Sequence, residues 1–177
     1  VGDRVVVNPR IVCGHCEYCL AGQQSLCDSY TVIGWHTHGG YAQYVKVPKG
    51  NLRRISGNCS LEEAAAIPVV STTAWRMLVT QAALKPGEDV LILSASGGVA
   101  SMAVQIAKLC GARVIATSST KEKLRRIKDL GADEVINYRE TAMDKAVMEI
   151  TNGRGVDVVL QTQGGLTWQQ SLNCAAK

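Results

Sequence analysis

The chain has 177 residues, of which 46% are hydrophobic and 19% are charged, and 19 Lys and Arg against 15 Asp and Glu give a formal net charge of +4. This charge is too small, and the basic residues are too scattered, to predict nucleic-acid binding. No apolar stretch approaches the roughly 18 residues of a membrane span, and the first residues lack the pattern of a secretory signal. We therefore expect a cytoplasmic globular protein without nucleic-acid or membrane partners.

Strands and loops are predicted for the first part of the chain. Val5-Val6-Val7 is an apolar run that ends at Asn8-Pro9, and residues 44–48 alternate between apolar and polar side chains. Both patterns favour short strands bounded by turns. We therefore assign residues 1–60 to a β-rich, loop-heavy domain.

The apolar period becomes helical from Leu61 onward. It predicts helices over residues 62–66 and 72–84, separated near Pro68 and closed by Pro86-Gly87. We expect the domain boundary at the start of this stretch, so that residues 61–177 form the second domain.

The rest of the chain alternates between short apolar runs and amphipathic segments. Strands are predicted over residues 90–93, 114–116, 135–136 and 156–160, and helices over residues 99–110, 121–130, 142–151 and 167–176. Parallel neighbouring strands need connections of about a dozen or more residues, which these helices provide. The order predicts an α/β fold with a doubly wound (Rossmann) parallel sheet, present in part.

Four of the seven cysteines lie close together in the first domain. Cys13, Cys16, Cys19 and Cys27 have the spacing C-x2-C-x2-C-x7-C. Four thiolates at such separations suit a tetrahedral Zn²⁺ with no open position, which gives the metal a structural role. Residues 10–30 contain few large apolar side chains, so the metal would stabilise a lobe that has little core of its own.

Other interpretations of the cysteines remain open. Bacterial ferredoxins begin with the same C-x2-C-x2-C, although their fourth cysteine comes sooner and precedes Pro, whereas Cys27 precedes Asp28. Free thiols are the remaining alternative. Neighbouring His15 is expected to be solvent-exposed, since four thiolates already complete a zinc shell.

A glycine turn follows the first strand of the second domain. Ala95-Ser96-Gly97-Gly98-Val99-Ala100 leads from this strand into a helix. Of the G-x-G-x-x-G fingerprint only the middle glycine, Gly97, is present, because Ala95 and Ala100 replace the other two. A residue without Cβ lets the backbone approach a pyrophosphate, whose charge the helix N-terminus stabilises. The turn therefore predicts dinucleotide binding.

The end of the next strand indicates which dinucleotide is preferred. NAD-binding sites have an acidic residue about 20 residues after the glycines, and here Ser118 takes that place, followed by Ser119 and Lys123. Hydroxyls and a cation can bind a 2′-phosphate that a carboxylate would repel. We therefore expect NADP rather than NAD, although the lysines of this segment equally suit a solvated helix start.

Several short motifs occur in an order that resembles a known family. They are Gly2-Asp3-Arg4-Val5, the four cysteines, Gly39-Gly40-Tyr41-Ala42, Pro68, Thr73-Ala74, Lys85-Pro86-Gly87, Gly97-Gly98-Val99 and Gly131-Ala132-Asp133. In this order they resemble the medium-chain dehydrogenase/reductase superfamily over essentially the whole chain. The resemblance is closest to zinc-containing alcohol dehydrogenases and the related quinone oxidoreductase-like branch.

The resemblance implies a partial GroES-like catalytic domain with a structural-zinc lobe, followed by linking helices and the first part of a Rossmann domain. It implies that the four cysteines ligate the structural zinc. It also implies that Trp35 and His36 either border the substrate pocket or serve only as packing residues of the core. The implied cofactor contacts are Thr73 near the nicotinamide amide, Ser96, Gly97, Gly98 and Val99 at the pyrophosphate, and Ser118, Ser119 and Lys123 at the adenosine ribose or its phosphate.

Two departures from the family pattern affect the expected chemistry. The third catalytic-zinc ligand of the family aligns with Val69, which cannot bind a metal, and the other two lie upstream of the Gly-Asp-Arg-Val motif where this chain begins. We therefore expect an internal fragment of a protein about twice as long, a parent that is a homodimer or homotetramer, and no activity in the 177 residues alone. No catalytic residue is identified.

Three functions follow as hypotheses. The leading one is hydride transfer between NADP(H) and a small alcohol, aldehyde or ketone. The alternative is an NADPH-dependent reductase of quinones, enones or enoyl groups without catalytic zinc. The third is a non-enzymatic, zinc-stabilised nucleotide-binding or redox-sensing protein, whose cysteines release the metal on oxidation.

Overall fold

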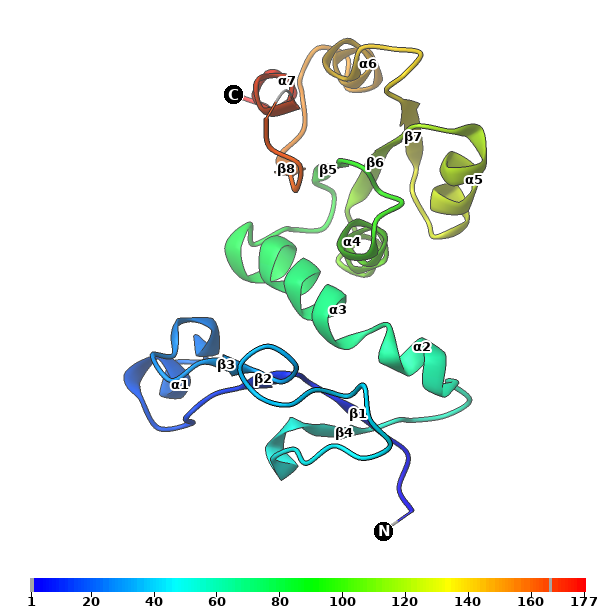
Figure 1. The fold of residues 1–177 in the computed structure, drawn as a ribbon. Helices are drawn as coiled ribbons and strands as arrows, with labels where there is room; N and C mark the ends of the chain where they lie inside the picture. Colours follow the sequence, from blue (N-terminus) through cyan, green and yellow to red (C-terminus); the bar gives the residue numbers. More distant parts are fainter. Residues whose placement is uncertain (1, 166) are drawn as a thin grey trace. The chain divides into compact units, whose positions relative to one another are not determined.

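The computed structural model describes residues 2–165 and 167–177, and the chain divides into two compact units, Val1–Val69 and Val70–Lys177. The sequence places the domain boundary between residues 60 and 61, whereas the first unit ends and the second begins within helix α3 (Pro68–Trp75). No sheet has strands from both units among the described residues (Figure 1). None of the helices in the described part of the chain is both long and apolar enough to cross a bilayer.

Two small antiparallel sheets form the framework of the first unit. Strand β1 (Val5–Val7) pairs with β4 (Leu52–Arg54), and β2 (Arg10–Ile11) pairs with β3 (Thr31–Val32). Because Ile11 lies opposite Thr31, the chain between β2 and β3 must fold back on itself as a lobe. That lobe contains the short helices α1 (Glu17–Leu20) and η1 (Gln24–Leu26).

The strand expected over residues 44–48 is absent. This segment pairs with no strand among the described residues, and the side chain of Tyr44 is 91% exposed. The alternating pattern was therefore a wrong indicator here, because a strand also needs a neighbour for its backbone hydrogen bonds. A short 3-10 turn, η2 (Lys49–Asn51), follows and leads into β4.

Helix α2 (Leu61–Ala65) begins with a capping box. The Ser60 hydroxyl accepts a hydrogen bond from the Glu63 amide at 3.1 Å, and the Ser60 amide donates to the Glu63 carboxylate at 2.8 Å. The next helix begins at Pro68, earlier than expected, because proline fits the first turn of a helix. It continues as a π-helical segment, η3 (Arg76–Gln81).

A four-stranded parallel sheet in the order β7-β6-β5-β8 organises the second unit and confirms the predicted fold class. Its strands are β5 (Asp89–Ile92), β6 (Arg113–Ser118), β7 (Glu134–Asn137) and β8 (Val158–Leu160). Its crossover helices are α4 (Gly98–Leu109), α5 (Lys121–Asp129) and α6 (Met143–Ile150), and α7 (Thr167–Asn173) follows β8.

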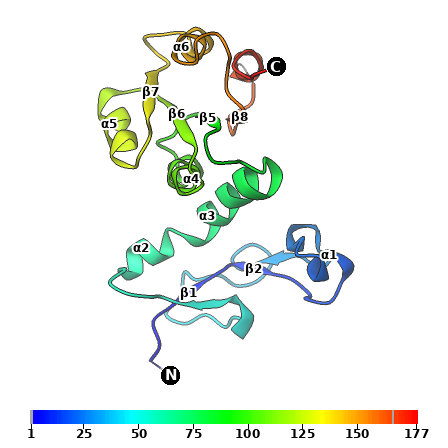
Figure 2. The same ribbon diagram turned by 180° about the vertical axis from the view of Figure 1, so that it is seen from behind.

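Apolar side chains cover both faces of this sheet. Val90 and Ile92 of β5 pack in one cluster with residues of α3, α4 and α5. Leu91, from the same strand, points to the other face, where Met143 and Val147 of α6 cover it. Figures 1 and 2 show α4 on one side of the sheet and α6 and α7 on the other. The continuous apolar run of β5 is thus explained by burial on both faces.

The last helix is shorter than expected because the chain after it pairs with Val156, just before β8. The Val156 amide donates to the Cys174 carbonyl at 2.8 Å, and the Ala176 amide donates to the Val156 carbonyl at 2.9 Å. This pairing brings the Cys174 backbone against Gly155, which is buried and has φ +85°.

Replacing Gly155 should test this contact. A Cβ there would lie 2.7 Å from the Cys174 carbonyl oxygen, whereas at Gly153 (φ +83°) a Cβ meets nothing within 4 Å. We expect Gly155→Ala to lower the free energy of unfolding by about 3 kcal/mol or more, and Gly153→Ala by about 1 kcal/mol from backbone strain alone. Urea denaturation measures both values, and equal losses would contradict the argument.

Candidate functional site

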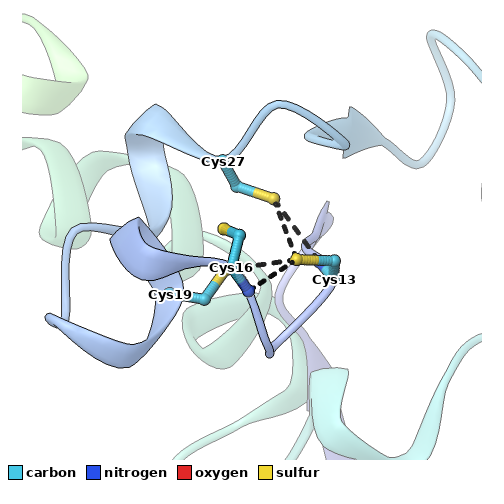
Figure 3. A group of neighbouring side chains, drawn as sticks. All are labelled: Cys13, Cys16, Cys19 and Cys27. Atoms are coloured by element: carbon cyan, nitrogen blue, oxygen red, sulfur yellow. Dashed lines mark hydrogen bonds between the residues drawn. The ribbon is translucent and has the colours of Figure 1, made fainter.

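The lobe between β2 and β3 brings the four cysteines together. Cys13 follows β2, Cys16 is the N-cap of α1, Cys19 lies within α1, and Cys27 follows η1. The base of the lobe is held by buried Asn51, whose side-chain nitrogen donates to the carbonyl oxygens of Asn8 and Arg10 at 2.7 and 2.6 Å. Figure 3 shows the four side chains gathered at one place.

The sulfur positions fit a single tetrahedral ion. The four Sγ atoms lie within 4.8 Å of one another, and Cys13 Sγ is 3.9 Å from Cys19 Sγ and 3.7 Å from Cys27 Sγ. Zn–S bonds of about 2.3 Å in tetrahedral geometry separate the sulfurs by about 3.8 Å. The predicted group is therefore brought together, and two of its sulfur separations match a tetrahedral zinc site.

Backbone amides of the lobe surround the sulfurs. The Cys16 amide donates to Cys13 Sγ at 3.3 Å, and the Cys13 amide donates to Cys27 Sγ at 3.5 Å. Hydrogen bonds from the backbone of His15, and then of Cys16, lower the pKa of Cys13 to about 6. Burial, as the main cause, raises the pKa of Cys19 to about 12. Thiolates this close repel one another, so all four ionise only around a cation.

The remaining candidates of the first unit are His15, Trp35 and His36. His15 is exposed, as expected, and among the described residues the only group that could ligate a metal is the four cysteines. Trp35 and His36 stack with ring centroids 5.8 Å apart, and Trp35 is 80% exposed. Neither lines the cavity of about 880 Å³ beside them, which His38, Tyr41 and Tyr44 border.

In the second unit, the glycine turn lies at the carboxyl end of β5. Gly97 is the N-cap of α4, and its amide donates to the Ser94 carbonyl at 3.0 Å. Gly97 and Gly98 are exposed, and a Cβ on Gly98 would lie 3.1 Å from Val70 Cγ1. The first N–H groups of a helix have no partners within the helix, so this turn presents them to an anion.

The turn also lies where the strand order reverses. In the sheet order β7-β6-β5-β8, connections from β5 lead first toward β6 and β7 and later return to β8 on its other side. In open α/β sheets the crevice at such a switch point, outside the carboxyl ends of the strands, is where ligands bind. Sequence motif and topology therefore mark the same place.

The structure brings some of the other predicted cofactor residues to this edge. Ser118, the last residue of β6, is buried, and its hydroxyl donates to the Ser96 hydroxyl at 3.3 Å. Lys123 is exposed in the first turn of α5, and its amide donates to Thr120 Oγ1. The remaining predicted contacts are half-buried, namely Thr73 on α3, Val99 on α4, and Ser119 after β6.

Sequence reasoning missed two residues at the same edge. Thr117 Oγ1 accepts a hydrogen bond from the Ser94 amide at 3.1 Å, and Gln163, beyond β8, donates from its side chain to Ser94 Oγ. Both also line a cavity of about 180 Å³ together with Tyr138 and Met143. The sequence offered no local signal for Gln163, because only the pairing of β5 with β8 brings it near the turn.

The chain is similar in sequence to known alcohol dehydrogenases. The family model of the alcohol dehydrogenase GroES-like domain matches residues 1–57, and that of the zinc-binding dehydrogenases matches residues 98–177. An alcohol dehydrogenase of Geobacillus stearothermophilus is 40% identical over 161 residues, which are 90% of this chain and 47% of that protein. An NAD-dependent alcohol dehydrogenase of Sulfurisphaera tokodaii is 38% identical over 164 residues, or 90% and 46% of the two chains.

A solved structure is similar over nearly the whole chain. The crystal structure of an NAD-dependent alcohol dehydrogenase superposes with a TM-score of 0.95 at 48% identity, covering 99% of this chain and 51% of that one. This chain thus spans about half the length of the curated relatives that it matches.

Thr117 provides a test of how the glycine turn is held. We expect Thr117→Val to lower the free energy of unfolding by about 1 to 3 kcal/mol, because the Ser94 amide loses its acceptor. Thr117→Ser keeps the hydroxyl and should cost about 1 kcal/mol or less. Amide exchange at Ser94, measured by NMR, should accelerate only in the valine variant. Unchanged exchange there would show that the hydroxyl does not hold the turn.

Proposed function

We propose that this chain, which belongs to the zinc-type alcohol dehydrogenases of the medium-chain dehydrogenase/reductase superfamily, is part of an NAD(P)-dependent oxidoreductase acting on a small alcohol or carbonyl compound. The observation that carries the proposal is the strand, glycine turn and helix at the switch point of the sheet. A bound dinucleotide supplies the hydride chemistry, and the residues of this chain bind and orient it.

We further propose that Cys13, Cys16, Cys19 and Cys27 bind one structural zinc ion. Sulfur separations of 3.7 and 3.9 Å support a single ion, whereas an iron–sulfur cluster would place several metal ions between wider-spaced thiolates. Four protein ligands leave no position for substrate, so the metal holds the lobe and takes no part in the reaction.

Metal analysis tests this site. We expect about one zinc and no iron per purified chain, and loss of the zinc in Cys13→Ser but not in Cys59→Ser, a half-buried cysteine of the same unit outside the cluster. Removal of the zinc by a chelator should accelerate hydrogen exchange in residues 12–30, because the free energy of metal binding is what folds such a lobe. Iron in the chain, or full zinc in Cys13→Ser, would contradict the proposed site.

The proposed dinucleotide site uses the carboxyl edge of the sheet. We place the pyrophosphate at Gly97 and Gly98, where the backbone is exposed and the N-terminus of α4 favours negative charge. Ser96 and Val99 flank it. The proposed contacts at the two ends of the dinucleotide are Thr73 for the nicotinamide and Ser118, Ser119 and Lys123 for the adenosine.

We propose NADP(H) as the preferred dinucleotide. The end of β6 carries the hydroxyls of Ser118 and Ser119, with Lys123 one helical turn further, and a 2′-phosphate meets no carboxylate at Ser118. Two related proteins are NAD-dependent alcohol dehydrogenases, which favours NAD(H) instead. A direct comparison of the two dinucleotides is therefore needed.

Fluorescence titration of the chain with NADPH and NADH makes this comparison. We expect NADPH to bind more tightly, and Ser118→Asp to raise the Kd for NADPH roughly tenfold or more relative to Ser118→Ala. Both variants lose the hydroxyl that donates to Ser96, but only aspartate adds a charge that repels the 2′-phosphate. Equal or tighter binding of NADH by the unmodified chain would assign NAD as the cofactor.

Val69 favours a second candidate function, reduction of a quinone, enone or enoyl group without catalytic zinc. Its hydrocarbon side chain stands where the family resemblance places a catalytic-zinc ligand, and it offers no metal-binding atom. Oxidation of alcohols by the intact enzyme, abolished when a second zinc is removed, would support the first function. Reduction of quinones with only one zinc per chain would support the second.

A further inference from the structure

Ser94 is the residue on which the hydrogen bonds of the glycine turn converge. Its φ of +49° lies in the left-handed region, where a residue with a side chain persists only if its surroundings hold it. Its amide donates to Thr117 Oγ1 on β6, and its carbonyl accepts from the Gly97 amide. Its hydroxyl accepts from the side chain of Gln163. One residue thus connects β6, the glycine turn and the loop after β8.

Gln163 is itself held in place by the start of α7. Its amide donates to Gln161 Oε1 at 2.6 Å. The side-chain nitrogen of Gln161 in turn donates to Thr167 Oγ1 at 2.8 Å and to Ser171 Oγ at 2.9 Å, and Ser171 is buried. These bonds fix the loop from which Gln163 reaches across the switch point to Ser94.

We infer that Gln163 is a dinucleotide-positioning residue, which acts through its hydrogen bond to Ser94 to hold the glycine turn in the conformation that receives a pyrophosphate. The inference rests on the proposed dinucleotide site. A strained turn that is held before binding does not have to be ordered by the ligand, and this preorganisation increases affinity. The increase in affinity applies to ligands with a pyrophosphate, because the bond holds the turn that contains Gly97 and Gly98.

Two ligands separate this role from a general structural one. ADP-ribose contains the pyrophosphate, and adenosine lacks it, although both can occupy the adenosine end of the site. We expect Gln163→Met to raise the Kd for ADP-ribose about fivefold, the worth of one hydrogen bond, and to change the Kd for adenosine less than twofold. Isothermal titration of the 177-residue chain measures both constants.

Two further variants complete the design. Ser94→Ala removes the other end of the same bond and should have the same effect, with no additional loss in the double variant. Gln170→Met makes the same chemical change at another glutamine lining the 180 Å³ cavity, and should leave the ratio of the two constants unchanged. Circular dichroism checks that each variant folds. If Gln163→Met or Ser94→Ala does not fold, the other of these two variants still tests the bond.

Equal weakening of both ligands by Gln163→Met, or additive losses in the double variant, would overturn the inference while leaving the dinucleotide site intact. Binding of neither ADP-ribose nor NADPH by the unmodified chain would instead contradict the proposed function, and the inference with it. The two failures are therefore distinguishable.

Discussion

Parallel pairing of β5 with strands on both of its sides is the constraint on which the second unit depends. Val90 pairs with Val114 on one side and with Val158 on the other, so β5 is buried along its whole length. The same pairing gathers the carboxyl ends of β5, β6 and β8 at one edge. The hydrophobic core and the candidate dinucleotide site therefore have a common origin, because an error in strand order would destroy both.

The first unit is organised by a different physical principle. Among its described residues only Cys19, Cys27, Asn51 and Ala64 are buried, so burial of apolar surface contributes little there. Short strands close the base of the cysteine lobe, and Asn51 satisfies the backbone carbonyls that the turn leaves open. A metal ion would then be the main source of stability for residues 12–30, in the manner of other small zinc-dependent lobes.

Much of the fold was predictable because its signals are local. The buried strands, the helices ended by Gly111 and Gly131, and the turn at Gly97 follow from apolar periodicity and glycine placement, and all occur close to the expected positions. The prediction of a strand over residues 44–48 was wrong. Alternation of apolar and polar residues shows only which side chains would face solvent, whereas a strand also requires a partner for its backbone hydrogen bonds. Helix α3 began early because Pro68 starts a helix as readily as it ends one.

By itself, the sequence determined the local patterns on which the proposed chemistry rests: the thiols at zinc spacing, the glycine turn between strand and helix, and the absence of a carboxylate at position 118. Each depends on residues close together in the chain, whose geometry the backbone restricts to a few forms. Only the tertiary structure decided which distant residues share the site. Gln163 donates a hydrogen bond to Ser94, which lies 69 positions earlier in the sequence. Thr117, on the neighbouring strand β6, accepts a hydrogen bond from the Ser94 amide. Such contacts depend on strand order and register, which arise from packing of the whole sheet and not from any local pattern.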